Sequence, residues 1–347
     1  MDPDRAAALD VALADARRTL NAPGLSLAVR LADGTVWTSV VGRAQVGPDA
    51  SDVTAQTAFS AGSITKTFVA TVVMQLVEEG VIHLDDPLSR WLPRYPNGSR
   101  ISIEELLSHT SGLYDYFDNP KFESLVFGRP MHRWSMSEIL ALVKAPTAKP
   151  GAEFGYSNTN FALLGKVLRR GTGRSVGALV RGRLLEPLGL GDTRYQDRAP
   201  EGLISAMGYI RANHAWAGWS DGTAYRPNTS AATVAAAAGA ILSTPSDLVR
   251  WAHALYAEAT LVSAGSVARM TTFNEGDYGL GTELFATTDD PATAEPMWGH
   301  SGSLRGFEAQ LWYVPSRDVT IALMGNRGRV SLRPVVQELL AALFGGP

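Results

Sequence analysis

Hydrophobic and polar residues alternate in short runs at both ends of the chain, and this pattern predicts β-strands. The N-terminal runs are LSLAVRL (25–31) and VWTSVVG (36–42). The turn between them contains Asp33-Gly34, which is typical of a hairpin. The C-terminal runs are YGLGTEL (278–284), GFEAQLWYV (306–314) and DVTIALMGN (318–326).

Elsewhere, apolar residues recur with the period of an α-helix. The segments RAAALDVALADARRTL (5–20) and SITKTFVATVVMQLVEEG (63–80) have this pattern, and a final amphipathic helix is predicted at 331–344. The chain between residues 81 and 274 reads as helices separated by loops rich in Pro and Gly. The candidates there are 102–108, 136–144, 157–170, 175–185 and 246–257.

Strands at both ends and helices in the middle predict an α/β fold with an all-α part. We expect an antiparallel β-sheet built from the two termini and flanked by the terminal helices. Residues 1–80 and 275–347 would form this α/β domain, and residues 81–274 an inserted, mostly helical domain. The strands do not alternate regularly with helices, which argues against a doubly wound parallel sheet.

The composition of the chain excludes several classes of function. The chain has 347 residues and a formal net charge of -3, with no basic run interleaved with aromatics, so we expect no nucleic-acid partner. It has no cysteine, which excludes disulfides, thiol catalysis and thiolate metal ligands. The histidines are scattered without metal-binding spacing, so no metal or organic cofactor is expected.

Location is predicted from two absences in the sequence. No stretch is long enough for a membrane span. The N-terminal segment lacks the apolar core of a signal peptide, so we expect a cytoplasmic protein. A mature exported protein, trimmed of its signal peptide, would give the same pattern.

Two segments match the G-x-S-x-G pattern of a nucleophilic serine, GRSVG (173–177) and GWSDG (218–222). That pattern needs a strand before the serine and a helix after it. The first segment follows a predicted helix, and the second follows no apolar strand. Ser175 is better explained as the N-cap of the next helix, and Ser220 as part of a loop.

Ser63 and Lys66 lie three residues apart in the apolar run AFSAGSITKTFVATVV, and so share one face of the predicted helix. Ser63 falls in the first turn, where free backbone N–H groups and the helix dipole favour negative charge. A desolvated lysine beside it loses its proton more readily and acts as a base. The alternative is that Ser63 caps the helix and Lys66 points to solvent.

Two further motifs carry candidate chemistry. Tyr156-Ser157-Asn158 stands at the entry to the predicted helix 157–170, where a tyrosine can move a proton and an amide can hold a substrate carbonyl. His300-Ser301-Gly302 lies just before the predicted strand 306–314, and glycine there permits a close approach of substrate. The alternatives are a helix cap with a packed tyrosine, and a core histidine beside a hairpin turn.

Taken in order, S-x-x-K at 63–66, Y-x-N at 156–158 and H-x-G at 300–302 resemble the three active-site motifs of one serine family. That family includes class C β-lactamases, D-alanyl-D-alanine carboxypeptidases and related esterases. The segments LLSHTSGLYDY and YGLG are also similar, so the resemblance covers nearly the whole chain. It is closest to soluble actinobacterial-type DD-carboxypeptidases, and it implies a β-lactamase/transpeptidase-like fold with the active site between the two predicted domains.

The resemblance also implies roles for the catalytic residues. Ser63 would be the nucleophile, and Lys66 would activate it or tune Tyr156. Tyr156 would pass the proton between Ser63 and the leaving group. His300 would take the place of a lysine found in many β-lactamases, and Asn158 would bind the acyl-side carbonyl.

The remaining candidates would bind substrate. The backbone N–H groups of Ser63 and Ser303 would form an oxyanion hole. Ser301 and Gly302 would line the site, and Arg305 would be the one cation for a substrate carboxylate. The segment after YGLG offers no arginine there, only the acids Glu283, Asp289, Asp290 and Glu295. The nearby His109 and Ser111 are predicted to be structural.

The implied activity is that of a serine hydrolase acting on a small-molecule or short-peptide substrate. It would cleave an amide or ester through a Ser63 acyl-enzyme, as a DD-carboxypeptidase, D-stereospecific peptidase or esterase does. An acyltransferase or peptide-cyclising thioesterase uses the same acyl-enzyme and remains open, as does a non-catalytic β-lactam- or peptide-binding protein. The sequence leaves the oligomeric state undecided.

Overall fold

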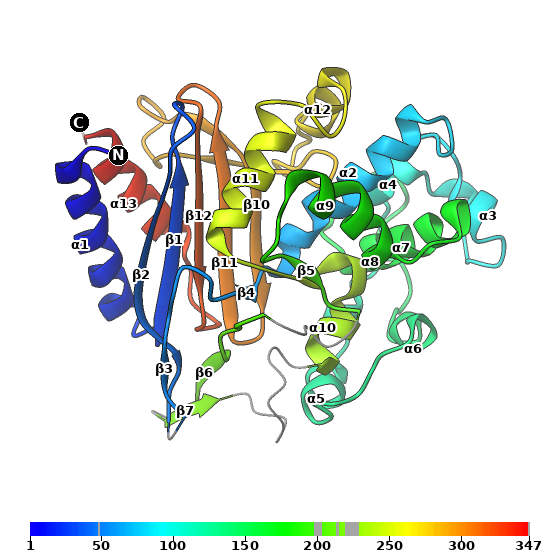
Figure 1. Ribbon diagram of the computed structural model, residues 1–347. Helices are drawn as coiled ribbons and strands as arrows, with labels where there is room; N and C mark the ends of the chain where they lie inside the picture. Colours follow the sequence, from blue (N-terminus) through cyan, green and yellow to red (C-terminus); the bar gives the residue numbers. More distant parts are fainter. Residues whose placement is uncertain (48, 198–202, 213–214, 219–228, 346–347) are drawn as a thin grey trace.

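The computed structural model describes residues 1–47, 49–197, 203–212, 215–218 and 229–345. Its centre is an antiparallel sheet of order β3-β2-β1-β12-β11-β10-β9 (Figure 1). The pairing of β1 with β12 joins the two ends of the chain and confirms the predicted terminal sheet. The strands are β1 (Gly24–Arg30), β2 (Val36–Gln45), β3 (Ser51–Asp52), β9 (Glu283–Ala286), β10 (Pro296–Leu304), β11 (Phe307–Val314) and β12 (Val319–Gly325).

Helices cover both faces of this sheet (Figure 1). They are α1 (Pro3–Thr19), α13 (Arg333–Phe344), α11 (Pro245–Tyr256) and α2 (Thr65–Glu78). Side chains alternate along each strand, so Leu27 of β1 faces the core under α1 and α13, whereas Ala28 faces the core on the α11 side. Phe68 of α2 stacks on Trp251 of α11 at 3.8 Å between ring centroids, which fixes α2 beside the sheet.

The middle of the chain is mostly helical, as predicted, with short elements that the pattern does not show. Strand β8 (Ile241–Ser243) lies between β4 (Phe59–Ser60) and β5 (Arg194–Tyr195), and β6 (Tyr209–Ala212) pairs with β7 (Ala215–Gly218). Strands of two to four residues are too short for a visible alternation. The helices here are α3 (Leu88–Trp91), α4 (Ile103–Leu107), α5 (Phe122–Phe127), α6 (Met136–Leu140), α7 (Asn158–Thr172), α8 (Val176–Val180), α9 (Glu186–Leu188), α10 (Thr229–Ala235) and α12 (Ala264–Met270).

Near the C-terminus the sequence pattern misplaces one strand and misses another. The strand expected at 278–284 is absent, because Gly281 adopts a φ of +72° in a turn and β9 begins only at Glu283. His300-Ser301-Gly302 precede β11, as predicted, but they also lie within β10, a strand that the pattern does not predict. The small and polar residues of GHSGSL hid this strand, since they lack the bulky β-branched residues that signal strands.

Among the described residues, no helix is both long and apolar enough to cross a bilayer. The division of the chain into a terminal and an inserted domain stays a prediction.

Candidate active site

Ser63 lies in a 3₁₀ turn, Gly62–Ile64, that leads directly into α2. The apolar run that follows buries almost all of α2, so the start of the helix is fixed within the core. The hydroxyl of Ser63 does not cap the helix. Its oxygen accepts hydrogen bonds from Lys66 Nζ and from Tyr156 Oη, each at 2.9 Å.

Lys66 has no exposed surface, which rules out the solvent-pointing alternative. Besides Ser63, its Nζ donates to Asn158 Oδ1 at 2.8 Å and to the backbone oxygen of Ala238 at 3.0 Å. Burial lowers the pKa of Lys66 to about 7, although the negative charges of Asp115 and Glu283 act in the other direction. Lys66 therefore holds and releases a proton near neutral pH.

Tyr156 and Asn158 come from the segment where α7 begins. Tyr156 is 36% exposed as a residue, but desolvation of its phenol raises the pKa of Tyr156 well above 10, and the nearby charge of Glu283 raises it further. Asn158 is held at both ends of its amide, since Oδ1 accepts from Lys66 and Nδ2 donates to Asp115 Oδ2 at 2.8 Å. The second Nδ2 hydrogen remains available to a substrate carbonyl.

Two glycines let β10 lie against the nucleophile turn. A Cβ on Gly302 would lie 2.0 Å from the backbone oxygen of Ala61 and 3.3 Å from the Ser63 nitrogen. Gly62 has a φ of +51°, and a Cβ there would lie 2.7 Å from the Ser303 nitrogen. The backbone of Ser303 thus reaches the Ser63 turn, as the predicted oxyanion hole requires.

His300 is completely buried one layer behind Tyr156, with 6.4 Å between ring centroids. Its Nε2 forms a hydrogen bond with Tyr278 Oη at 2.9 Å, and its Nδ1 lies 3.4 Å from Glu283 Oε1. Burial lowers the pKa of His300, which favours the neutral ring at pH 7.

His109 and Ser111 are also buried below Tyr156. His109 Nδ1 accepts from the Ser157 N–H at 3.2 Å and lies 2.9 Å from Asn160 Nδ2, while the ring packs 4.3 Å from that of Tyr156. Ser111 Oγ donates to Asn160 Oδ1 at 2.6 Å. These contacts support the tyrosine and the start of α7, which fits the structural role predicted for both residues.

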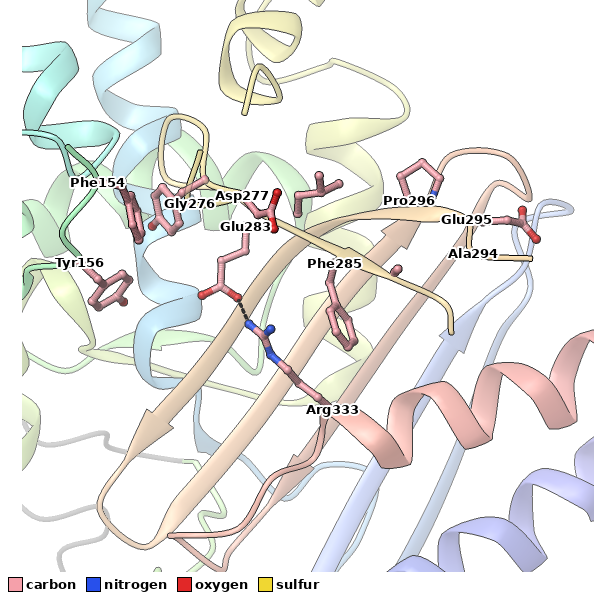
Figure 2. Close-up of a pocket in the computed structure, with 13 residues that line it drawn as sticks. Phe154, Tyr156, Gly276, Asp277, Glu283, Phe285, Ala294, Glu295, Pro296 and Arg333 are labelled. Atoms are coloured by element: carbon pink, nitrogen blue, oxygen red, sulfur yellow. Dashed lines mark hydrogen bonds and ion pairs between the residues drawn. The ribbon is translucent and has the colours of Figure 1, made fainter. Parts of the chain in front are cut away.

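A pocket of about 590 Å³ opens beside Tyr156 (Figure 2). Arg305 is not among its described lining residues, and the charges acting on Arg305 include those of Glu123 and Arg329. The cation that lines this pocket is Arg333, at the start of α13. The pocket is lined by Phe154, Tyr156, Gly276, Asp277, Tyr278, Glu283, Leu284, Phe285, Ala286, Ala294, Glu295, Pro296 and Arg333.

Sequence reasoning missed three residues of this centre. Asp115 holds Asn158, Tyr278 bonds to His300, and Arg333 pairs with Glu283 at 2.9 Å. Asp115 and Tyr278 stand within the family-like segments 106–116 and 278–281, which was the available signal. Arg333 has no such signal, since only the fold brings the start of the last helix to this pocket.

Ser175 lies away from this centre and caps α8, its Oγ accepting from the Ala178 N–H at 3.2 Å. Ser220 lies outside the described residues. Within the part of the chain that the structure describes, no group of three or more His, Asp or Glu side chains is arranged to hold a metal ion.

Comparisons with known proteins agree with the family that the three motifs indicate. A family model described as Beta-lactamase matches residues 10–342, so this chain belongs to the β-lactamase family, and the predicted resemblance is confirmed. The Streptomyces sp. D-stereospecific amidohydrolase structure is similar, with a TM-score of 0.80, 30% identity and 99% of both chains covered. Its likeness over the full length also confirms the predicted β-lactamase/transpeptidase-like fold.

Two curated relatives extend this picture. Penicillin-binding protein 4* of Bacillus subtilis is 28% identical over 83% of this chain, and the match spans 65% of that protein's length. Penicillin-binding protein 4 of Amycolatopsis lactamdurans is 28% identical over 95% of this chain and 88% of its own length.

Proposed function

We propose that this protein is a serine hydrolase that cleaves an amide or ester bond through an acyl-enzyme on Ser63. The observation that carries this proposal is the position of the Ser63 oxygen, 2.9 Å from both Lys66 Nζ and Tyr156 Oη. A nucleophile within hydrogen-bond reach of two proton-transfer groups is the arrangement that acyl transfer needs. The similarity to a D-stereospecific amidohydrolase supports an amide next to a D-configured residue as substrate.

Lys66 is the better general base of the two partners. Its pKa is lowered to about 7, so a large fraction is neutral at physiological pH, whereas the raised pKa of Tyr156 keeps the phenol protonated. Neutral Lys66 takes the Ser63 proton as Oγ attacks the substrate carbonyl carbon. The backbone N–H groups of Ser63 and Ser303 then stabilise the oxyanion, and the spare Nδ2 hydrogen of Asn158 holds the acyl-side carbonyl.

Tyr156 completes both halves of the reaction. Its phenol gives a proton to the leaving nitrogen or oxygen as the bond to the carbonyl carbon breaks. The resulting phenolate is stabilised by the Lys66 ammonium, whose Nζ lies 4.9 Å from the ring centroid. The phenolate next takes a proton from water, the hydroxide attacks the acyl carbon, and Lys66 returns its proton to Ser63. An amine in place of water would make this an acyl transfer.

Ser175 provides a matched control for the test, because it lies in a G-x-S-x-G segment and serves only as a helix cap. The wild type, Ser63→Ala and Ser175→Ala proteins are incubated with benzylpenicillin and with D-phenylalanine p-nitroanilide. We expect a penicilloyl mass adduct and p-nitroaniline release from wild type and Ser175→Ala, and neither from Ser63→Ala. Turnover that survives in Ser63→Ala, or no adduct and no turnover with the wild type, would overturn the proposal.

A further inference from the structure

Tyr156, but not Ser63, is among the described residues that line the pocket of about 590 Å³. Tyr156 gives its proton to the departing group in the proposed mechanism, so that group must lie on the Tyr156 side of Ser63. The pocket begins at Phe154 and Tyr156 and continues along β9 to Pro296 and Arg333 (Figure 2). A leaving group that extends beyond its reacting atom would pass from Tyr156 into this pocket, where its far end would meet the lining residues.

Among the described lining residues, the one cation, Arg333, already has a carboxylate partner. Glu283 Oε2 lies 2.9 Å from Arg333 Nη2, and the dashed line in Figure 2 marks this pair. The side chain of Glu283 is 14% exposed, so solvent screens its charge little. A second carboxylate that bound to Arg333 would lie beside Glu283 and be repelled by it.

Each member of the pair is also held independently of the other. Glu283 accepts from the backbone N–H of Ser301 at 3.0 Å and from its hydroxyl at 2.9 Å. The Arg333 guanidinium lies over the rings of Phe285 and Trp312, 4.8 Å and 5.7 Å from their centroids. Neutralising Glu283 would thus leave Arg333 in the pocket with an unpaired positive charge.

The other charges of the pocket act in the same direction. Asp277 and Glu295 also line it, so its described lining residues hold three carboxylates and one guanidinium. Arg317 pairs with Glu295 at 2.6 Å and offsets its charge. Glu283, Asp277 and Arg333 therefore leave an excess of one negative charge in the pocket without any carboxylate from a substrate.

We infer that the Glu283–Arg333 ion pair sets leaving-group specificity, by excluding leaving groups that end in a free carboxylate in favour of those that end in an amide, an ester or an amine. This inference rests on the proposed function and narrows its substrate class: the enzyme is an amidase, aminopeptidase-like hydrolase or esterase rather than a carboxypeptidase.

The test compares two substrates that differ only at the end of the leaving group, N-acetyl-D-Ala-D-Ala and N-acetyl-D-Ala-D-Ala-NH₂. The readout is the ratio of kcat/KM for the carboxylate to that for the carboxamide. Effects of Glu283 on Tyr156 or His300 act on both substrates and cancel in this ratio. We expect wild type to favour the carboxamide, and Glu283→Gln to raise the ratio roughly tenfold or more, as for one new charge-assisted hydrogen bond.

Arg333 gives a prediction of opposite sign. Arg333→Gln leaves Glu283 unpaired in the pocket, so the ratio should fall below that of wild type. The double variant Glu283→Gln/Arg333→Gln removes both charges and should return the ratio close to the wild-type value. Glu79→Gln, which breaks the ion pair with Arg183 outside this pocket, should leave the ratio unchanged.

A binding measurement separates failure of this inference from failure of the proposed hydrolysis. On the Ser63→Ala background, D-alaninamide and D-alanine are titrated and followed by NMR. Weaker binding of D-alanine, reversed by Glu283→Gln, supports the inference even if no variant turns over substrate, an outcome that would count against the proposed function alone. A preference of the wild type for the carboxylate substrate would overturn the inference. So would a Glu283→Gln variant in which both the kcat/KM ratio and the relative affinity for D-alanine and D-alaninamide stay within twofold of the wild-type values.

Discussion

The Nζ atom of Lys66 lies 2.9 Å from the Ser63 oxygen in a position with no exposed surface. A lysine that is charged in such a place needs three acceptors, and it has them in Ser63, Asn158 and Ala238. When Lys66 is neutral, its Nζ has a lone pair that can accept a hydrogen bond from the Ser63 hydroxyl. Both protonation states thus fit the same geometry, as expected of a group that gains and loses a proton in each cycle.

The pH dependence of acylation follows from this relationship. Burial lowers the pKa of Lys66 to about 7, and only the neutral amine acts as a base, so the acylation rate should rise with pH and be half-maximal near pH 7. Stopped-flow acylation by an activated ester from pH 5 to 9 measures this rise. The arginine of Lys66→Arg stays charged, so this variant should lose the rise of the acylation rate with pH and should acylate at least roughly 100-fold more slowly than wild type. A flat wild-type profile would exclude Lys66 as the base.

Alanine substitutions of Ser63 and Ser175 should separate effects on acylation from effects on stability. Ser63→Ala should abolish the acyl-enzyme, and its effect on the free energy of unfolding should be limited to the loss of one acceptor of Lys66, because the Ser63 hydroxyl caps no helix. Ser175→Ala removes the N-cap of α8 and should cost about 1 kcal/mol of stability without loss of acylation. Urea unfolding of both variants measures their stability, and intact-mass analysis measures their acylation. The opposite pattern would mean that the nucleophile is misassigned.

Gly302→Ala tests the close approach of β10 to the nucleophile turn. The new methyl would lie 2.0 Å from the Ala61 oxygen, so strand or turn must move. We expect acylation to fall at least 100-fold, since displacement of reacting groups by about 1 Å has that effect, and stability to fall by about 1–3 kcal/mol. Gly191→Ala is the control, because nothing lies within 4 Å of its added Cβ. Near-normal acylation by Gly302→Ala would show that the close approach of β10 to the Ser63 turn is not needed.

The sequence predicted those parts of the fold and site that depend on local pattern. The terminal sheet, the helix after Ser63 and the three motifs are each visible as periodicity or as residues at fixed spacing. The sequence did not reveal β10, because its glycines and serines allow this strand to lie close to the Ser63 turn. A strand in such a position has no room for the bulky residues that mark a strand in a sequence. Arg333 was missed because only tertiary packing brings α13 to β9, and no local pattern reports a contact across 50 residues.

Glu308, opposite Ser303 on β11, should limit stability at high pH. Burial raises the pKa of Glu308 to about 7. Between the ordinary glutamate pKa and pH 7 the folded state therefore binds more protons than the unfolded state, and the free energy of unfolding falls as pH rises through this window. Both bonds to Glu308, from Ser303 Oγ and the Arg329 N–H, end on Oε1, which a glutamine oxygen can replace.

Glu308→Gln should accordingly match wild type at pH 4.5 and exceed it by about 1–3 kcal/mol at pH 8.5. Urea unfolding at the two pH values measures the difference. Glu79→Gln is the control of opposite sign, because Arg183 lowers the pKa of Glu79 and its charge is stabilising above that pKa. If Glu308→Gln gains nothing at pH 8.5, the carboxylate beside Ser303 is ionised at no cost. Its burial would then not be a source of the pH dependence of stability.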